Sequence, residues 1–177
     1  IFLEDHWKRD GGGGGRTRIL KNANVIEKGG VNFSAVHGRL PENIRFALKL
    51  PDKEFYATGV SIVMHPHSPM VPIIHMNVRY FEVGETWWFG GGIDLTPHYI
   101  IEEDARYFHA QLKAACDRHH SSYYPDFKKW ADDYFFIKHR NETRGVGGIF
   151  FDRLSSNDGF TKEQRFDFVK DVGKTFA

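Results

Sequence analysis

Cysteine is nearly absent from this chain, and neither sign of charge dominates it. Cys116 is the single cysteine among 177 residues, so an internal disulfide is excluded and a reducing compartment is favoured. Lysine and arginine total 24 against 23 aspartate and glutamate, which leaves no basic surplus for nucleic acid. No apolar run approaches the ~20 residues of a membrane span, and no signal or transit segment is visible at the start. We therefore expect no nucleic-acid partner and no transmembrane segment.

Familiar catalytic motifs are missing as well. Gly11 to Gly15 form a run of five glycines, but Arg16-Thr17-Arg18 follows where a phosphate loop needs Gly-Lys-Ser/Thr. The chain has no His-Glu-x-x-His zinc motif and no Gly-x-Ser-x-Gly nucleophile motif. We expect the glycine run to be a flexible loop. The sharper alternative is a mobile loop whose flanking arginines close over an anionic ligand.

Aromatic residues, by contrast, are plentiful, at 15% of the chain with 16 phenylalanines. Such an excess is typical of a core of large side chains, and a pocket for a flat apolar ligand is the alternative. The length suggests one domain. Alternation and turn residues predict strands at residues 18–21, 25–28, 31–36, 55–65, 73–83, 86–89 and 149–151. Helical spacing predicts helices at residues 102–119 and 126–138, and a last helix that begins at Thr161 with a capping box.

The predicted strand at residues 73–83 carries the most unusual pattern. Side chains alternate between the faces of a strand, so His75, Asn77 and Arg79 share one face. Ile74 and Met76 begin the opposite, apolar face. A strand that needs only burial has little reason to align a titratable ring, an amide and a fixed cation. This face therefore indicates a binding or catalytic site.

Several arginines could extend such a site. Arginine binds carboxylates through two parallel hydrogen bonds. An arginine pocket with aromatic walls and a histidine would suit a large ligand with several carboxylates. The candidates lie beside glycines or on the polar strand face, namely Arg16, Arg18, Arg79, Arg140 and Arg144. For any one of them, a solvated surface charge is the simpler interpretation.

Two other chemistries receive less support from the sequence. The histidines that could bind a metal, His65, His75, His109 and His139, are scattered and lack clustered ligand spacing. Cys116 lies within a helical apolar stripe, which is typical of a buried structural thiol and not of a nucleophile.

Long motifs resemble one known family, the oxygen-dependent coproporphyrinogen III oxidases. The resemblance runs nearly the length of the chain through residues 27–34, 75–83, 87–97, 127–135 and 144–152. It implies an α+β fold, in which a large bent antiparallel sheet is flanked by helices on both sides, and a homodimer. It also implies that residues 1–177 form a single domain, the N-terminal and central part of a longer chain.

The implied reaction belongs to heme biosynthesis. Such an enzyme converts two propionates of coproporphyrinogen III to vinyl groups, which gives protoporphyrinogen IX. Molecular oxygen is the co-substrate, and carbon dioxide and hydrogen peroxide leave. Motif by motif, the resemblance implies a proton donor at His75, substrate contacts at Ser61, Asn77, Val78 and Arg79, and further pocket residues at Asp94 and Arg144.

The resemblance defines less well whether a metal is used, where the protein is located and which family motifs the chain contains. Some members are described with a divalent metal on histidines that match His65, His75, His109 and His139, and we favour chemistry without a metal. We expect a cytoplasmic protein, with a mitochondrion or plastid as the alternative. A later Tyr-Asp-Arg-Gly motif of the family is absent from residues 1–177. The alternative function is therefore a tetrapyrrole-binding remnant without catalysis.

Overall fold

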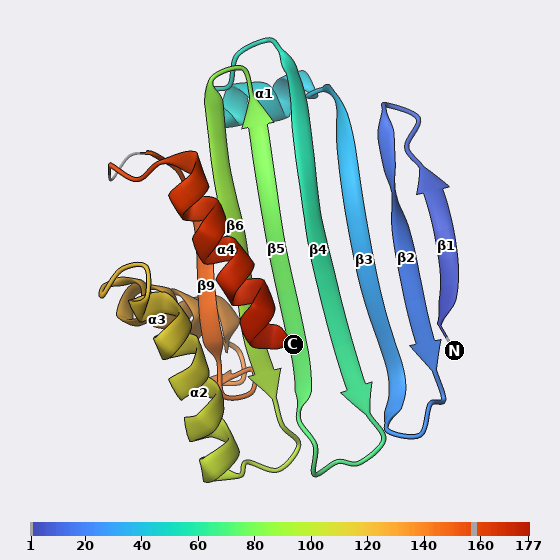
Figure 1. Cartoon of the computed structure of the whole chain (residues 1–177), viewed down its shortest axis with the longest axis vertical. Helices are drawn as coiled ribbons and strands as arrows, with labels where there is room; N and C mark the ends of the chain where they lie inside the picture. Colours follow the sequence, from blue (N-terminus) through green and yellow to red (C-terminus); the bar gives the residue numbers. More distant parts are fainter. Residues whose placement is uncertain (1, 157–158) are drawn as a thin grey trace.

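The computed structural model describes residues 2–156 and 159–177, and a seven-stranded antiparallel sheet dominates it (Figure 1). The strand order is β1-β2-β3-β4-β5-β6-β9. The strands span Leu3–Lys8 (β1), Gly13–Lys21 (β2), Ile26–Arg39 (β3), Glu54–Pro66 (β4), Ile73–Val83 (β5), Thr86–Thr96 (β6) and Gly148–Leu154 (β9). A small second sheet pairs Phe136–Ile137 (β7) with Glu142–Thr143 (β8).

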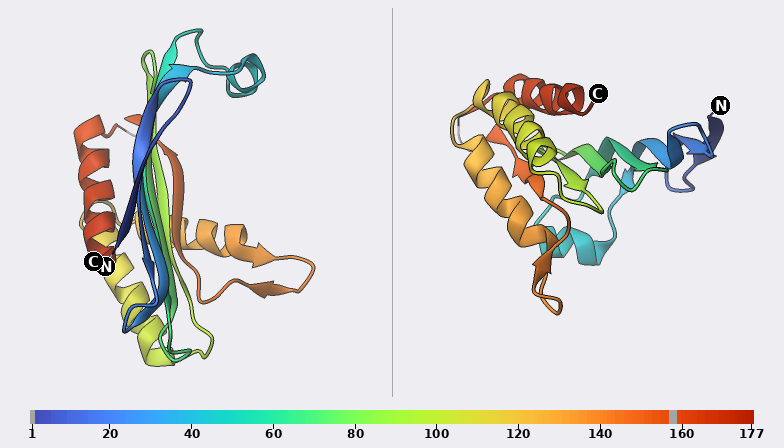
Figure 2. Two further views of the ribbon diagram at one scale, coloured as in Figure 1. Left: turned by 90° about the vertical axis from the view of Figure 1, so that its right-hand side faces the viewer. Right: turned by 90° about the horizontal axis from the view of Figure 1, so that it is seen from below.

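Among the described residues, four helices flank the large sheet. They span Glu42–Leu48 (α1), Glu102–Asp117 (α2), Tyr123–Phe135 (α3) and Lys162–Phe176 (α4). α2 and α4 lie over one face of the sheet, while α1 and the end of α3 project from the other (Figure 2). We call the first the helix face and the second the cleft face. The α+β architecture with helices on both sides is therefore confirmed. Within the described ranges, no helix is long and apolar enough to cross a membrane.

The main core lies between the helix face and helices α2 and α4. Met76, Phe89 and Ile93 of the sheet are at most 5% exposed, and Phe168 and Val172 of α4 are fully buried against them. This is the apolar side of the alternation that the sequence shows in β5. A smaller core on the cleft face joins Leu50, Phe55 and Val83.

α3 runs along the outer strand β9 and contacts both of its faces. Phe127 packs on Phe151 in the main core, with ring centroids 5.4 Å apart. One residue earlier in β9, Phe150 points to the cleft face and stacks on Tyr134 at 4.4 Å. The helix thus closes this edge of the sheet and places its last turn beside the cleft.

Local sequence explains where the later helices begin. The Thr161 hydroxyl accepts a hydrogen bond from the Gln164 amide, and the Gln164 side chain accepts one from the Thr161 amide, so the predicted capping box of α4 is confirmed. α3 begins at Tyr123, three residues earlier than predicted, because Pro125 fits the first turn of a helix. It ends at Phe135 because the next two residues pair in β7.

The predicted glycine loop is wrong. Gly13–Gly15 belong to strand β2, and a tight turn closes the β1–β2 hairpin, in which the Gly12 amide donates to the Arg9 carbonyl at 3.0 Å. A side chain at Gly15 would clash with the Trp7 ring, which lies over this position from β1. The bare backbone therefore accommodates a tryptophan of the neighbouring strand.

Other strand boundaries also differ from the prediction. The short predicted strands at residues 18–21, 25–28 and 31–36 are parts of the longer β2 and β3. The predicted strand at residues 86–89 is too short, since β6 continues through Gly90 to Gly92 and ends at Thr96. Pairing with β5 holds all three glycines in the sheet, and Gly91 and Gly92 also pair with β9.

Candidate active site

The register of three central strands gathers most of the predicted site residues on the cleft face. Ser61 of β4 lies directly opposite Asn77 of β5, and His75 lies directly opposite Asp94 of β6. Paired residues of an antiparallel ladder point to the same face. Arg79 follows two residues after Asn77 and shares that face. Residues that are distant in sequence thus form one polar surface.

Asp94 is the electrostatic centre of this surface. It is only 4% exposed, and its Oδ2 atom accepts a hydrogen bond from His75 Nδ1 at 3.1 Å and forms an ion pair with Arg144 Nη2 at 2.9 Å. The Thr96 hydroxyl donates to the same oxygen at 3.3 Å. Because a carboxylate only accepts, Nδ1 of His75 carries the proton in this bond. A buried carboxylate thus orients a histidine and an arginine at once.

Arg144 reaches Asp94 from a loop that is pinned to the sheet. The Val146 amide donates to the Leu95 carbonyl at 3.0 Å, and the Arg144 amide donates to the Phe135 carbonyl at 3.0 Å. The guanidinium also lies over the Phe135 ring, 4.3 Å from its centroid. His109 of α2 also holds this loop, through a 2.9 Å hydrogen bond to the Val146 carbonyl.

Arg79 is held separately from Arg144. Its Nη1 donates to Asn77 Oδ1 at 3.0 Å, and its Nη2 donates to Asp152 Oδ1 at 3.1 Å. The guanidinium carbon lies 5.8 Å from the Phe150 ring centroid. About 40% of the Arg79 side chain is exposed, so part of the cation faces the cleft.

Two hollows adjoin at this surface and share Ser61, Asn77 and Arg79. The first, the histidine lobe, measures about 480 Å³ and is lined in addition by His75, Asp94, Tyr134, Phe135, Arg144 and Phe150. The second, the tryptophan lobe, measures about 470 Å³ and adds Asn32, Ser34, Thr58, Phe81, Trp88 and Asp152. Each volume is in the range of small-molecule sites, and aromatic and cationic groups meet in both.

Three of the predicted arginines lie away from the cleft. Arg16 and Arg18 are on the helix face of β2, where Arg18 pairs with Glu4 of β1 at 2.5 Å. Arg140 pairs with Glu142 at 2.6 Å in the exposed β7–β8 turn. The alternative of a mobile loop whose flanking arginines, Arg16 and Arg18, close over an anionic ligand is therefore wrong.

Val78 has its side chain on the helix face, where it packs against the main core. A contact between Val78 and a substrate can therefore concern only its main chain. The prediction of a substrate contact at this position remains a prediction.

The four histidines of the suggested metal set do not gather in one place. His65 and His75 are neighbours, with ring centroids 5.9 Å apart. His109, however, contacts the Val146 carbonyl in the loop of Arg144, and His139 is exposed in the β7–β8 turn. Across the described ranges, no three residues of the types His, Cys, Asp and Glu lie close enough to hold a metal ion.

His109 is also engaged at both ring nitrogens. Nε2 donates to the Val146 carbonyl, so Nδ1 accepts from the Tyr124 hydroxyl at 3.1 Å and the ring is neutral. Burial lowers the pKa of His109, and burial with nearby Lys28 also lowers the pKa of His65. The residues present therefore do not fit a metal site made of these four histidines.

The sequence interpretation missed the aromatic walls and one acidic residue. Tyr134 and Phe135 come from the last turn of α3, and Phe150 and Asp152 come from β9. Alternation within the predicted strand at residues 149–151 separates Phe150 from its neighbours, which was the available signal. The position of α3 beside β9 depends on tertiary packing and has no such signal.

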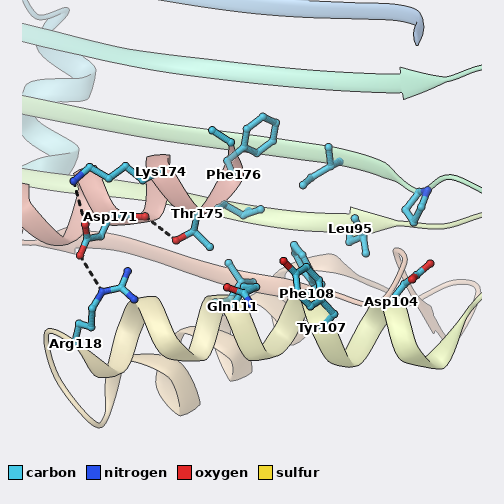
Figure 3. Close-up of a pocket in the computed structure, with 15 residues that line it drawn as sticks. Leu95, Asp104, Tyr107, Phe108, Gln111, Arg118, Asp171, Lys174, Thr175 and Phe176 are labelled. Carbon is cyan, nitrogen blue, oxygen red and sulfur yellow. Dashed lines mark hydrogen bonds and ion pairs between the residues drawn. The ribbon is translucent and has the colours of Figure 1, made fainter. Parts of the chain in front are cut away.

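A separate hollow of about 620 Å³ lies on the helix face between α2 and α4 (Figure 3). Arg118, directly after α2, and Lys174 of α4 both pair with Asp171, at 3.3 and 3.6 Å, and join the walls of the hollow. Hydrogen bonds from His119 and Arg118 lower the pKa of Asp171. None of the predicted site residues lines this hollow.

Comparisons with known proteins identify the family of this chain. The family model described as coproporphyrinogen III oxidase matches residues 1–177. An oxygen-dependent coproporphyrinogen-III oxidase from Drosophila melanogaster is 51% identical over 98% of this chain and 47% of its own length. One of the same name from Parasynechococcus marenigrum (strain WH8102) is 52% identical over 92% of this chain and 46% of its own length. The chain thus spans about half the length of the curated relatives it matches.

Proposed function

The chain belongs to the coproporphyrinogen III oxidase family, and from this premise we propose that the whole protein is an oxygen-dependent coproporphyrinogen III oxidase of heme biosynthesis. One observation carries the proposal. A buried carboxylate, Asp94, orients His75 and Arg144 in a hollow whose other wall holds a second arginine, Arg79. Cations, a proton donor and aromatic walls are what a macrocycle with carboxylate arms requires.

The proposed reaction needs no group beyond substrate and oxygen to balance. Each propionate loses carbon dioxide and a hydrogen from its inner methylene, and a carbon–carbon double bond forms. The electron pair and two protons reduce molecular oxygen to hydrogen peroxide. Two such steps convert two propionates to vinyl groups, so oxygen is the co-substrate.

The two arginines supply binding for carboxylates in the proposed site. Arg79 lies in strand β5 and Arg144 lies in the loop before β9, and each reaches the histidine lobe independently of the other. Such a spacing suits a ligand with several carboxylates better than a small acid. Asn77 and Ser61 lie between the cations and can hydrogen-bond the remaining polar groups.

His75 would act as the proton donor. Asp94 engages Nδ1, so Nε2 is the nitrogen that can exchange a proton with a ligand. The carboxylate fixes the tautomer and the orientation of the ring. Asp94 itself would favour positive charge on a nearby pyrrole, because negative charge in a buried site acts strongly.

The experiment uses the protein expressed from its complete coding sequence. Wild type, Arg79→Ala and His75→Ala are incubated with coproporphyrinogen III under air, and vinyl product, carbon dioxide and peroxide are measured. We expect wild type to form protoporphyrinogen IX and each variant to lose at least about 100-fold in kcat/KM. Unchanged vinyl formation in both variants would show that the site assignment is wrong.

A tetrapyrrole-binding protein without catalysis is the second candidate, because the chain spans about half of its relatives. Porphyrin binding by residues 1–177 without release of peroxide or carbon dioxide would favour it for this part of the protein. We further propose a homodimer and a cytoplasmic location. Sedimentation of the purified protein and fractionation of its source cells test these two points.

A further inference from the structure

We propose that Asp152 is a positioning residue, which holds the guanidinium of Arg79 across the floor of the cleft so that it meets a substrate carboxylate in a fixed place. The inference rests on the proposed function, in which Arg79 binds a carboxylate. Neither the motif resemblance nor the alternation of β5 pointed to Asp152. It emerges from the arrangement of three neighbouring strands.

Arg79 and Asp152 lie on strands that are not neighbours. Arg79 belongs to β5 and Asp152 to β9, with β6 between them. The arginine side chain therefore crosses β6 to reach the 3.1 Å contact between Nη2 and Asp152 Oδ1. Asn77 accepts from Nη1 at 3.0 Å, and Phe150 lies near one surface of the guanidinium. A long, flexible cation is thus held at three points.

Gly90 is the reason that this crossing is sterically allowed. It pairs directly with Arg79 in the β5–β6 ladder. A Cβ atom at this position would lie 2.5 Å from Asp152 Oδ1 and 2.7 Å from Arg79 Nε. Both distances are shorter than non-bonded atoms tolerate, so any side chain here would displace the ion pair. The glycine and the carboxylate are therefore parts of one arrangement.

The pair still leaves Arg79 able to bind a ligand. A guanidinium has five N–H donors, and the contacts with Asn77 and Asp152 use two of them. The other three can meet a carboxylate. Asp152 also lines the tryptophan lobe, whereas Arg79 lines both lobes. The carboxylate thus fixes the cation at the boundary between the lobes.

An opposite role for Asp152 makes a different prediction. If the carboxylate competed with substrate for Arg79, its removal would lower KM. If it positions Arg79, its removal raises KM, because the side chain must then be ordered during binding. Asparagine separates the two roles, since its amide oxygen still accepts a hydrogen bond while the negative charge is gone.

The test compares Asp152→Ala, Asp152→Asn and Gly90→Ala in the protein expressed from its complete coding sequence. Asp167→Ala is the matched control, since Asp167 is an exposed acid of α4 that pairs with Lys170. Vinyl formation gives kcat and KM, fluorescence titration with coproporphyrin III gives Kd, and thermal unfolding verifies the fold. For Asp152→Ala and Gly90→Ala we expect KM and Kd to rise about fivefold, with kcat within about twofold of wild type. Asp152→Asn and Asp167→Ala should stay within about twofold in all three.

Each result has a defined meaning. Unchanged or lower KM and Kd in Asp152→Ala, in a folded protein, would overturn the positioning role. An equal rise in Asp152→Asn would overturn it as well, because charge and not geometry would then be responsible. If wild type forms no vinyl product, the proposed function fails, while the Kd values still decide whether Asp152 positions Arg79.

Discussion

Strands β5 and β6 have one buried, apolar face and one open, polar face. On the helix face, Met76 and Ile93 are almost fully buried under α4. On the cleft face, Asn77 and Arg79 lie beside the bare backbone of Gly92 and Gly90, respectively, and face two hollows. Since side chains alternate, one residue of register separates the two. The same strands therefore bury a core on one side and line the proposed site on the other.

The largest effect should come from a change that affects only the helix face. Phe168 of α4 is fully buried and its ring lies 5.1 Å from that of Phe151. We expect Phe168→Ala to lower the free energy of unfolding by about 3–5 kcal/mol, because it leaves a cavity in a close-packed core. Urea unfolding measures this change. A loss below about 1 kcal/mol would mean that the two faces do not differ in stability as we describe.

The next largest effect should be a loss of activity from a change on the cleft face, with little change in the stability of the core. Asp94→Asn removes the negative charge that His75 and Arg144 share, while the side-chain volume is kept. We expect kcat to fall about 100-fold, and the free energy of unfolding to fall by less than about 2 kcal/mol. The control is Asp133→Asn, which changes an exposed pair with Lys129. Full turnover by Asp94→Asn would contradict the central role of this carboxylate.

A smaller effect should link the two faces through pH. His109 joins α2 to the Arg144 loop in its neutral form, and burial lowers its pKa below the ordinary 6.5. The unfolded chain therefore binds the proton first as pH falls. The stability from neutral His109 is complete above pH 6.5 and is lost below it, toward the lowered folded pKa. We expect His109→Gln to lower the free energy of unfolding by about 1 kcal/mol at pH 8 and by less at pH 5.5.

Urea unfolding of both proteins at the two pH values measures this difference. An equal loss at both values would show that the protonation of His109 is not involved. A reduced kcat in the same variant would show that α2 supports the cleft through the Arg144 loop.

The smallest effect concerns a helix cap that supports only the helix face. Thr161→Ala removes the side-chain acceptor at the beginning of α4. We expect a loss of about 1 kcal/mol in the free energy of unfolding. Thr161→Ser should retain most of the stability, and neither variant should change KM. A changed KM in folded Thr161→Ala would show that α4 reaches the cleft in a way that its position does not suggest.

Local patterns predicted some elements well. The strand at residues 73–83 and its division into two faces are confirmed, because alternation reports burial directly. The helix at residues 102–119 is confirmed as α2, which ends two residues earlier at Asp117. The resemblance supplied the roles of the site residues, which alternation alone does not provide.

The glycine runs were misread because their neighbours are distant in sequence. Gly15 lies under Trp7 of another strand, and Gly90 lies under Arg79. A local pattern cannot show whether bare backbone is in a loop or beneath a side chain from elsewhere. For the same reason, Tyr134 and Asp152 were missed, since their places in the cleft depend on how α3 and β9 pack.

The course of α3 along β9 has a mechanical consequence. Phe127 is fixed in the main core, and Tyr134 forms the cleft wall seven residues later, about 10 Å along the helix axis. A helix is stiff over this distance, and the core around Phe127 is packed too closely to yield. The core therefore fixes the position of α3 at Phe127, and the stiff helix fixes the backbone of its last turn. A ligand that displaced the backbone of this last turn would have to move the whole helix or unwind the turn, so the position of the wall at the Tyr134 backbone is fixed by the core.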